Sequence, residues 1–393
     1  MIKFDFDTKY IDQQKKQIYL NKKMDIYQKF AYSGMTGWTH EFDEKILDDI
    51  ISLKNEVKKN ADCLVVIGIG GSYLGSYAVR SMFQSYFPKN DFPIYYVGNT
   101  LSSTYMEELL EELKEKDFYL NVISKSGTTL EIMITYQFLF NLMKEKYNEE
   151  ELKKRVIMTT DIEKGKLREE VKKYGYRSFS IPEDIGGRYS IITPAHLFPL
   201  SFSIDIKKFV KGYFEGKKYR EEAYQYACTR KLLYEKSKFV EIFSVSEEKA
   251  LPFTEWLKQL FAESEGKEGL GIFPVSILTT RDLHSLGQFI QDGTKILSET
   301  FIQVEKKNNL KYQGQNLHEM NNKITDSIRI AHDKGNVPTN KITISSINEE
   351  EVGELIYFFL MSAAFSGFLF GINPFDQEGV EVYKKEVHKN LGI

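Results

Sequence analysis

Short apolar runs rich in β-branched and aromatic residues alternate with segments of helical periodicity along most of the chain. Helical patterns lie between these runs, for example over Ser103–Glu115 and Leu130–Lys144. Strand, helix and strand repeated at this spacing predict βαβ units and a parallel sheet. The expected strands form two series: Cys63–Ile67, Pro93–Val97, Phe118–Ile123, Arg155–Thr159 and Arg177–Ile181, and then Phe239–Phe243, Gly271–Ser276, Thr300–Val304 and Lys341–Ile344.

The two series predict an α/β protein with two tandem domains, each a parallel sheet flanked by helices. We expect an N-terminal helical segment over 1–57 that packs on the second domain. A first domain over 58–200 carries the candidate phosphate-binding loops, and a second over 201–393 ends in C-terminal helices.

The segment 355–375 has no charged residue and is long enough to cross a bilayer. However, it contains Ser362, Ser366 and Gly371, and it ends in Asn373-Pro374. These interruptions favour a buried core helix, so we expect no membrane association.

Composition narrows the function classes. The 393 residues include 53 Lys and Arg and 56 Asp and Glu, a net charge of -3 that gives no electrostatic motive for nucleic-acid binding. The two cysteines, Cys63 and Cys228, cannot form a disulfide framework, and we interpret them as free thiols. Free thiols are typical of a reducing compartment, so we expect a cytoplasmic protein.

Two strand ends carry turns rich in glycine and hydroxyl groups, and each turn leads into a helix. Gly68–Ser72 follows the first expected strand, and Ser124–Thr129 follows the third. Glycines let the backbone approach a ligand, and the amides at a helix start attract anions. The two turns therefore predict a phosphate cradle. The alternative is a pair of tight structural turns, with Thr128 and Glu131 forming a capping box.

Known nucleotide motifs fail at their decisive positions. Gly68 and Gly70 match a dinucleotide fingerprint, but Tyr73 occupies the position of its third glycine. Gly70 and Gly75 have the spacing of a nucleotide P-loop, but Ser76 replaces its lysine. The sequence therefore favours a phosphate compound other than these nucleotides.

Acid–base candidates lie further along the chain. Gln259 and Glu263 are four residues apart and share one helix face, although this face could be a solvated edge. Arg188 follows two glycines, which places a fixed cation beside flexible backbone, unless it is a surface arginine.

Lys384 interrupts an apolar stripe near the C-terminus. A lysine on a buried helix face is costly unless it is paired or used, although it can also extend to solvent. None of the six histidines forms a closely spaced pair, so we expect no zinc site. The stripe has helical spacing and comprises Gln377, Val380, Lys384, Val387 and Leu391.

Six motifs occur in one order from about residue 60 to residue 390: GIGGSYLG (68–75), VISKSGTTLE (122–131), IPEDIGGRYS (181–190), FAESEGK (261–267), DLHSLGQ (282–288) and NPFDQEGVEVYKK (373–385). Together they resemble the phosphoglucose isomerase family, in its bacterial form. The resemblance implies two sugar-isomerase (SIS) domains and a homodimer whose active sites are shared between subunits. It also implies isomerisation of glucose 6-phosphate and fructose 6-phosphate in glycolysis and gluconeogenesis, through a cis-enediolate and without metal or cofactor.

The same resemblance assigns residue roles. Glu263 matches the base that moves the proton between C2 and C1, and Arg188 matches the arginine that stabilises the enediolate. His284 and Lys384 match the groups that open the sugar ring, with the histidine supplied by the neighbouring subunit. The substrate-binding positions are Gly71, Ser72, Ser124, Lys125, Ser126 and Thr129 for the phosphate, and Gln259 and Gln377 for the sugar.

Three functions remain open at this point. The first is phosphoglucose isomerase, and the second is a related isomerase, such as a dual glucose and mannose enzyme or an aminosugar enzyme. The third is a non-catalytic module that senses sugar phosphates, because a fold alone does not separate these functions. The joint presence of Glu263, Arg188, His284 and Lys384 favours catalysis.

Overall fold

The structure is a computed structural model that describes residues 1–6, 9–41, 43–89, 91–306 and 308–392. The chain forms two compact units. One unit is Thr36–Val210, and the other combines Met1–Met35 with Lys211–Ile393. The expected N-terminal segment 1–57 is thus divided between the two units, and the division into domains at 57 and 200 stays a prediction.

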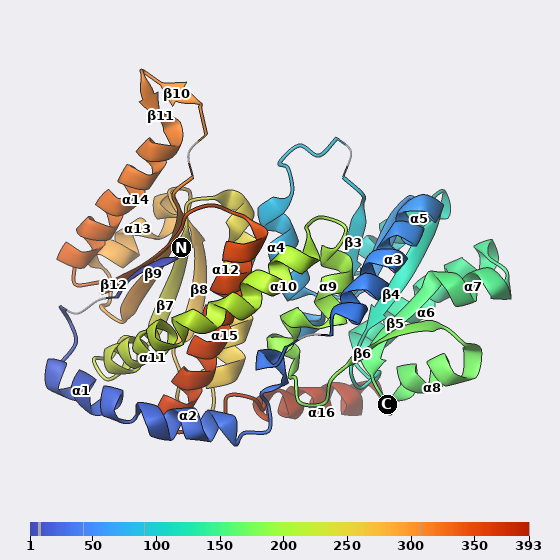
Figure 1. Cartoon of the computed structure of the whole chain (residues 1–393), viewed down its shortest axis with the longest axis horizontal. Helices are drawn as coiled ribbons and strands as arrows, with labels where there is room; N and C mark the ends of the chain where they lie inside the picture. Colours follow the sequence, from blue (N-terminus) through green and yellow to red (C-terminus); the bar gives the residue numbers. More distant parts are fainter. Residues whose placement is uncertain (7–8, 42, 90, 307, 393) are drawn as a thin grey trace. The chain divides into compact units, whose positions relative to one another are not determined.

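The unit Thr36–Val210 is built on a five-stranded parallel sheet in the order β3-β2-β4-β5-β6 (Figure 1). Every residue of β2, β4 and β5 is buried, as expected for parallel strands that helices cover on both faces. The strands are β2 (Cys63–Ile67), β3 (Ile94–Val97), β4 (Phe118–Ile123), β5 (Val156–Asp161) and β6 (Arg177–Ile181).

Helices of this unit connect the strands and cover the sheet. Their apolar faces join the strands in one core, which includes Leu109 and Leu113 of α5 and Leu139 and Met143 of α6. The α-helices are α3 (Glu44–Asn60), α4 (Leu74–Phe83), α5 (Ser103–Lys114), α6 (Leu130–Lys146), α7 (Glu149–Arg155), α8 (Lys166–Tyr174) and α9 (Pro194–Leu200), and the 3-10 turns are η1 (Gly37–Thr39), η2 (Gly70–Ser72) and η3 (Gly187–Ile192).

The second unit has a sheet in the order β1-β12-β9-β7-β8. Four of its strands are parallel, and β1 pairs antiparallel with β12 at the edge. A separate hairpin pairs β10 with β11. The strands are β1 (Lys3–Asp5), β7 (Val240–Val245), β8 (Phe273–Leu278), β9 (Leu297–Val304), β10 (Lys311–Tyr312), β11 (Gln315–Asn316) and β12 (Thr339–Ile344).

The helices of the second unit include the long C-terminal helices that the sequence predicts. They are α1 (Gln13–Asn21), α2 (Lys23–Ala31), α10 (Ile206–Glu215), which begins in the first unit, α11 (Arg220–Tyr234), α12 (Leu251–Glu265), α13 (Leu283–Asp292), α14 (Leu317–Lys334), α15 (Glu349–Phe370) and α16 (Gly379–Leu391), with 3-10 turns η4 (Gly216–Tyr219) and η5 (Glu248–Ala250). The predicted fold class, an α/β protein with two parallel sheets flanked by helices, is confirmed.

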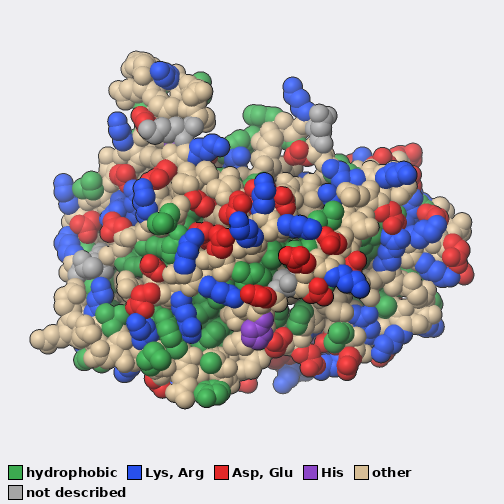
Figure 2. All heavy atoms as spheres, in the orientation of Figure 1, with side chains coloured by type: hydrophobic (Ala, Val, Ile, Leu, Met, Phe, Trp, Pro, Cys, Tyr) green, Lys and Arg blue, Asp and Glu red, His purple; other side chains and the backbone are tan. Residues whose placement is uncertain are grey.

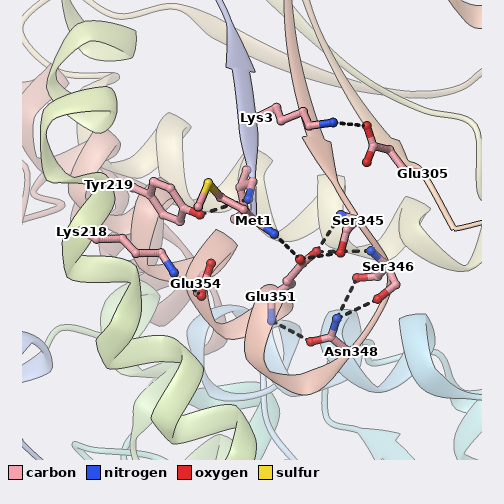
Figure 3. Close-up of polar contacts among 11 residues, drawn as sticks. Met1, Lys3, Lys218, Tyr219, Glu305, Ser345, Ser346, Asn348, Glu351 and Glu354 are labelled. Carbon is pink, nitrogen blue, oxygen red and sulfur yellow. Dashed lines mark hydrogen bonds and ion pairs between the residues drawn. The ribbon is translucent and has the colours of Figure 1, made fainter.

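The edge strand β1 was not predicted, because the sequence was interpreted as helical over 1–57. Polar contacts hold it to its neighbours (Figure 3). The Ile2 amide donates to the Tyr219 hydroxyl at 3.0 Å, and Lys3 pairs with Glu305 at 2.7 Å. Glu351, at the start of α15, accepts from the amides of Ser345 at 2.6 Å and Ser346 at 3.2 Å, and it fixes the turn after β12.

Most of the uncharged segment 355–375 lies in α15, which is a core helix, as predicted. Among the described residues it is the one helix long and apolar enough to cross a membrane, and 94% of its most apolar 18-residue window is buried inside the protein. It packs along α11 and α12.

On the face drawn in Figure 2, lysine and arginine side chains are interspersed with aspartate and glutamate.

Candidate active site

The parallel sheet of the unit Thr36–Val210 has a crevice position defined by its topology. The chain passes from β2 to β3 on one side and then crosses to β4 on the other side of β2. The strand order therefore reverses between β2 and β4. Ligands of open α/β sheets bind outside the carboxyl ends of the strands at such a switch point. The two predicted phosphate turns, Gly68–Ser72 and Ser124–Thr129, follow these two strands.

The turn after β4 is shaped by its own hydroxyl groups. The buried Ser124 hydroxyl accepts from the Gly127 amide at 3.0 Å, and it lies 3.5 Å from the Thr129 hydroxyl. Gly127 has φ +67°, and a Cβ there would lie 2.8 Å from the Leu167 amide nitrogen, so glycine is required. The turn is therefore held in one conformation before any ligand binds.

The predicted capping box of Thr128 and Glu131 is wrong. Helix α6 has Thr129 at its N-cap, with no side-chain hydrogen bond to the helix, and the Thr128 hydroxyl donates to Ser126 at 3.0 Å instead. Helix α4, after the other turn, likewise has an N-cap residue, Tyr73, with no capping side chain. Two helix starts without a capping side chain thus follow the two turns, which suits an anion.

Arg188 reaches this region through a close contact between two turns. Gly71 packs so tightly on the turn at η3 that a Cβ on it would lie 2.4 Å from the Gly187 carbonyl carbon and 2.9 Å from the Arg188 nitrogen. Arg188 follows directly and is only 3% exposed. The alternative of a solvated surface arginine is therefore wrong, because the turn that carries it is packed against the turn after β2.

Lys125 connects the turn after β4 to the same region. Its ammonium donates to the Glu183 carbonyl at 2.9 Å and to the Ile185 carbonyl at 3.2 Å, in the loop that precedes Arg188. Burial lowers the pKa of Lys125, although nearby carboxylates oppose this effect. The lysine thus links the phosphate turn to the arginine loop.

In the other unit, Gln259 and Glu263 lie in contact on α12, as their spacing predicts. The Gln259 amide donates to Glu263 at 3.0 Å, and both side chains are half-buried, so this face is not a fully solvated edge. Glu265 belongs to the core instead, where it forms an ion pair with Arg230. Burial raises the pKa of Glu265, although the arginine opposes this shift.

The remaining predicted residues lie on the surface of the same unit. His284, at the start of α13, and Gln377, just before α16, are both exposed. Lys384 is also exposed and forms an ion pair with Glu381 at 2.7 Å. The predicted buried face of this C-terminal helix is wrong for the single chain: none of its described residues is buried, although its apolar stripe has helical spacing.

Comparisons with known proteins identify the family of this chain. The sequence profile of the phosphoglucose isomerase family matches residues 39–328 and, in an overlapping match, 294–391. The chain belongs to the phosphoglucose isomerase family.

Individual proteins and solved structures are similar to most of this chain. A glucose-6-phosphate isomerase of Clostridium tetani is 41% identical over 91% of this chain and 86% of the relative. A hypothetical protein of Thermus thermophilus has the same fold, with a TM-score of 0.88 at 22% identity over 99% of this chain and all of that chain. A glucose-6-phosphate isomerase of Chlamydia trachomatis has a TM-score of 0.79 at 20% identity over 91% of this chain and 77% of that chain.

One buried residue beside the predicted phosphate turns was not among the candidates from the sequence. His196 is 1% exposed and contacts the backbone of the turn after β2. It lies among apolar residues of α9 without a motif around it, so nothing in its local sequence distinguishes it from a core histidine.

Proposed function

We propose that this protein interconverts glucose 6-phosphate and fructose 6-phosphate by ring opening and proton transfer through a cis-enediolate, in glycolysis and gluconeogenesis. Membership of the phosphoglucose isomerase family and 41% identity to a glucose-6-phosphate isomerase support this activity. The observation that carries it is the pair of turns at the topological switch point between β2 and β4. There two helix starts without capping side chains meet hydroxyl-rich turns, and a buried arginine lies on an adjoining turn.

The phosphate group anchors the substrate in this proposal. A dianion is stabilised by helix-start amides and hydroxyl donors, which both turns supply after β2 and β4. Anchoring one end of a flexible sugar orients its reacting carbons, which removes part of the entropic barrier. The residues assigned to this task are Gly71, Ser72, Ser124, Lys125, Ser126 and Thr129.

Proton transfer needs a base and a stabiliser of negative charge. Removing a proton next to a carbonyl places charge on two oxygens, and a carboxylate held near the carbon suits the first step. We assign Glu263 as this base, and the Gln259 amide that donates to it holds its carboxylate in place. Arg188 stabilises the enediolate, since a fixed guanidinium aimed at developing charge lowers the barrier.

Ring opening is a separate acid–base step. We assign it to His284 and Lys384, and we assign Gln377 to contact with the sugar. All three are exposed in the single chain, so they are accessible to a substrate or to a second copy.

The topology of the second unit supports a homodimer with shared sites. Helix α12 starts after the carboxyl end of β7 and returns along the sheet, so Glu263, in its last turn, lies toward the amino ends of the strands. His284 follows the carboxyl end of β8. The six residues of β8 separate these two positions by about 20 Å, too far for one substrate carbon chain. We infer that His284 completes the site of a second copy.

Turnover by purified protein tests the activity. We expect conversion of fructose 6-phosphate to glucose 6-phosphate, measured with a coupled dehydrogenase, with mannose 6-phosphate and glucosamine 6-phosphate as competing substrates. Preference for either competitor would assign the chain to a related isomerase. Binding of fructose 6-phosphate without turnover by any substrate would indicate a sensor.

Subunit complementation tests the shared site. Glu263→Gln and His284→Ala should each be inactive, but after unfolding, mixing and refolding, each mixed dimer regains one intact site. Because about half of the dimers are mixed, about a quarter of wild-type activity should return. A mixture that forms mixed dimers, verified with differently tagged subunits, but stays inactive would refute a site shared in this way.

The cellular location is inferred from the two cysteines. Cys63 and Cys228 are both buried free thiols. We infer that the enzyme works in the cytoplasm, where thiols remain reduced.

A further inference from the structure

His196 contacts two backbone groups near the crevice at once. Its Nδ1 lies 3.0 Å from the Ser76 amide, in the first turn of α4, and its Nε2 lies 2.8 Å from the Gly71 carbonyl oxygen. A backbone amide can only donate, so Nδ1 accepts and Nε2 carries the hydrogen that it donates to Gly71. The imidazole is therefore neutral, in one defined tautomer.

Ser190 extends this connection to the turn that carries Arg188. Its hydroxyl lies 2.6 Å from the Gly187 carbonyl oxygen, 3.2 Å from the Gly71 carbonyl oxygen and 3.1 Å from His196 Nε2. One imidazole and one hydroxyl thus connect three segments: the turn after β2, the start of α4 and η3.

We propose that His196 is a positioning residue that fixes the phosphate-binding turn at Gly71 against both helix α4 and the turn that bears Arg188. This inference rests on the proposed function, because it gives a role to the phosphate turn and the arginine. A neutral imidazole suits the task, since it accepts from one backbone group and donates to another across a rigid ring.

The surroundings of the ring keep it neutral. His196 is 1% exposed, and burial lowers its pKa to about 4. Protonation would place a second donor against the Ser76 amide, so the observed pair of hydrogen bonds requires the neutral form.

The alternative is a histidine that only fills the core. Its Cε1 lies 3.2 Å from where a Cβ on Gly75 would be, so the ring does pack closely on α4. The two interpretations differ in their consequence: loss of packing lowers stability, whereas loss of positioning also weakens phosphate binding in the protein that remains folded.

The test compares His196→Gln with His196→Leu. The glutamine amide offers one acceptor and one donor, whereas leucine has a similar size and offers neither. We measure the Kd for inorganic phosphate by calorimetry, KM and kcat for fructose 6-phosphate, and Tm. We expect leucine to raise Kd and KM about tenfold, to lower kcat and to lower Tm, and glutamine to keep Kd and KM within about threefold.

A buried histidine in the other unit provides the matched control. His332 is 4% exposed and bonds Glu299 through Nδ1 at 2.6 Å. His332→Leu should lower Tm but leave the phosphate Kd and KM unchanged, which separates loss of stability from loss of positioning.

The proposal is overturned if folded His196→Leu has a phosphate Kd and KM within twofold of wild type, or if glutamine is as impaired as leucine. If His196→Leu does not fold, Ser190→Ala decides, because it should weaken phosphate binding about fivefold, and an unchanged Kd overturns the proposal. Wild-type protein that binds inorganic phosphate but isomerises no sugar phosphate would refute the proposed function alone. Wild-type protein that binds neither would refute both.

Discussion

Adding one methyl group at Gly71 tests the contact on which the arrangement of the crevice depends. The new Cβ of Gly71→Ala would lie 2.4 Å from the Gly187 carbonyl carbon, 2.6 Å from its oxygen and 2.9 Å from the Arg188 nitrogen. All three are backbone atoms, so no side chain can rotate away. The turn after β2 or the turn at η3 must move.

The size of the effect follows from these distances. Ordinary contact begins near 3.4 Å, so the two turns must separate by about 1 Å. Overpacking of this kind costs about 1–3 kcal/mol of unfolding free energy, which lowers Tm by about 2–4 °C per kcal/mol in a domain of about 150–250 residues. A misplacement of about 1 Å near reacting groups can reduce the rate about 100-fold, so we expect kcat/KM to fall about 10- to 100-fold.

The assay measures kcat/KM for fructose 6-phosphate together with Tm, and Gly187→Ala is the matched control. Gly187 is the partner of Gly71 in this contact. The atom nearest to a Cβ on Gly187 would be Gly71 Cα at 3.9 Å, which is an ordinary van der Waals distance. Gly187→Ala should therefore keep near-wild-type activity and stability. Equal losses in the two variants, or wild-type activity in Gly71→Ala, would show that this contact does not position the two turns.

Other predictions address the base, the metal and the buried histidine. Glu263→Gln should abolish isotope exchange at C2 while fructose 6-phosphate still binds. Glu255→Gln, on the same helix, should leave this exchange unchanged. Exchange at the wild-type rate in Glu263→Gln would reassign the base. Treatment with a chelator should leave the rate unchanged, and activity lost and then restored by a divalent ion would contradict catalysis without metal. The pKa of His196 lies near 4 in the folded protein instead of the usual 6.5, so the unfolded chain binds more protons between these values. Acidification from pH 6.5 to pH 4 should therefore lower the free energy of unfolding of the wild type more than that of His196→Gln, as measured by urea unfolding. Equal losses of unfolding free energy in the two proteins would contradict this prediction.

Periodicity was sufficient to predict the elements that carry their own apolar pattern. Each expected strand overlaps an observed strand, although Arg155 ends α7 instead of opening β5. The strand β1 and the hairpin β10–β11, which have only two or three residues per strand, were not predicted. Such short strands form because a neighbouring strand pairs with them. Their own residues are too few to show the alternation of apolar and polar positions that predicts a strand.

The site was predictable as far as its chemistry follows from local sequence. A turn after a parallel strand, or an acid four residues from a glutamine, can be recognised within one short segment of sequence. The hydrogen bonds of Lys125 to the carbonyls of Glu183 and Ile185 could not be predicted, because these residues are 58 and 60 positions away. The exposure of Lys384 shows the opposite limit: periodicity defines a helix face, but only tertiary structure decides what covers it.

Three contacts join the phosphate turns to the loop of Arg188: the ammonium of Lys125, the packing of Gly71 on Gly187, and the hydrogen bond of Gly71 to His196, which continues to Ser190. The first holds the loop before the arginine, and the other two hold the turn that bears it. Donors fixed before the reaction stabilise developing charge without reorganising, which is where most electrostatic catalysis originates. A substrate whose phosphate enters these turns would therefore meet an arginine that is already in place. His284 and Lys384, which we assign to ring opening, are instead on the exposed surface, where a substrate or a second chain can reach them.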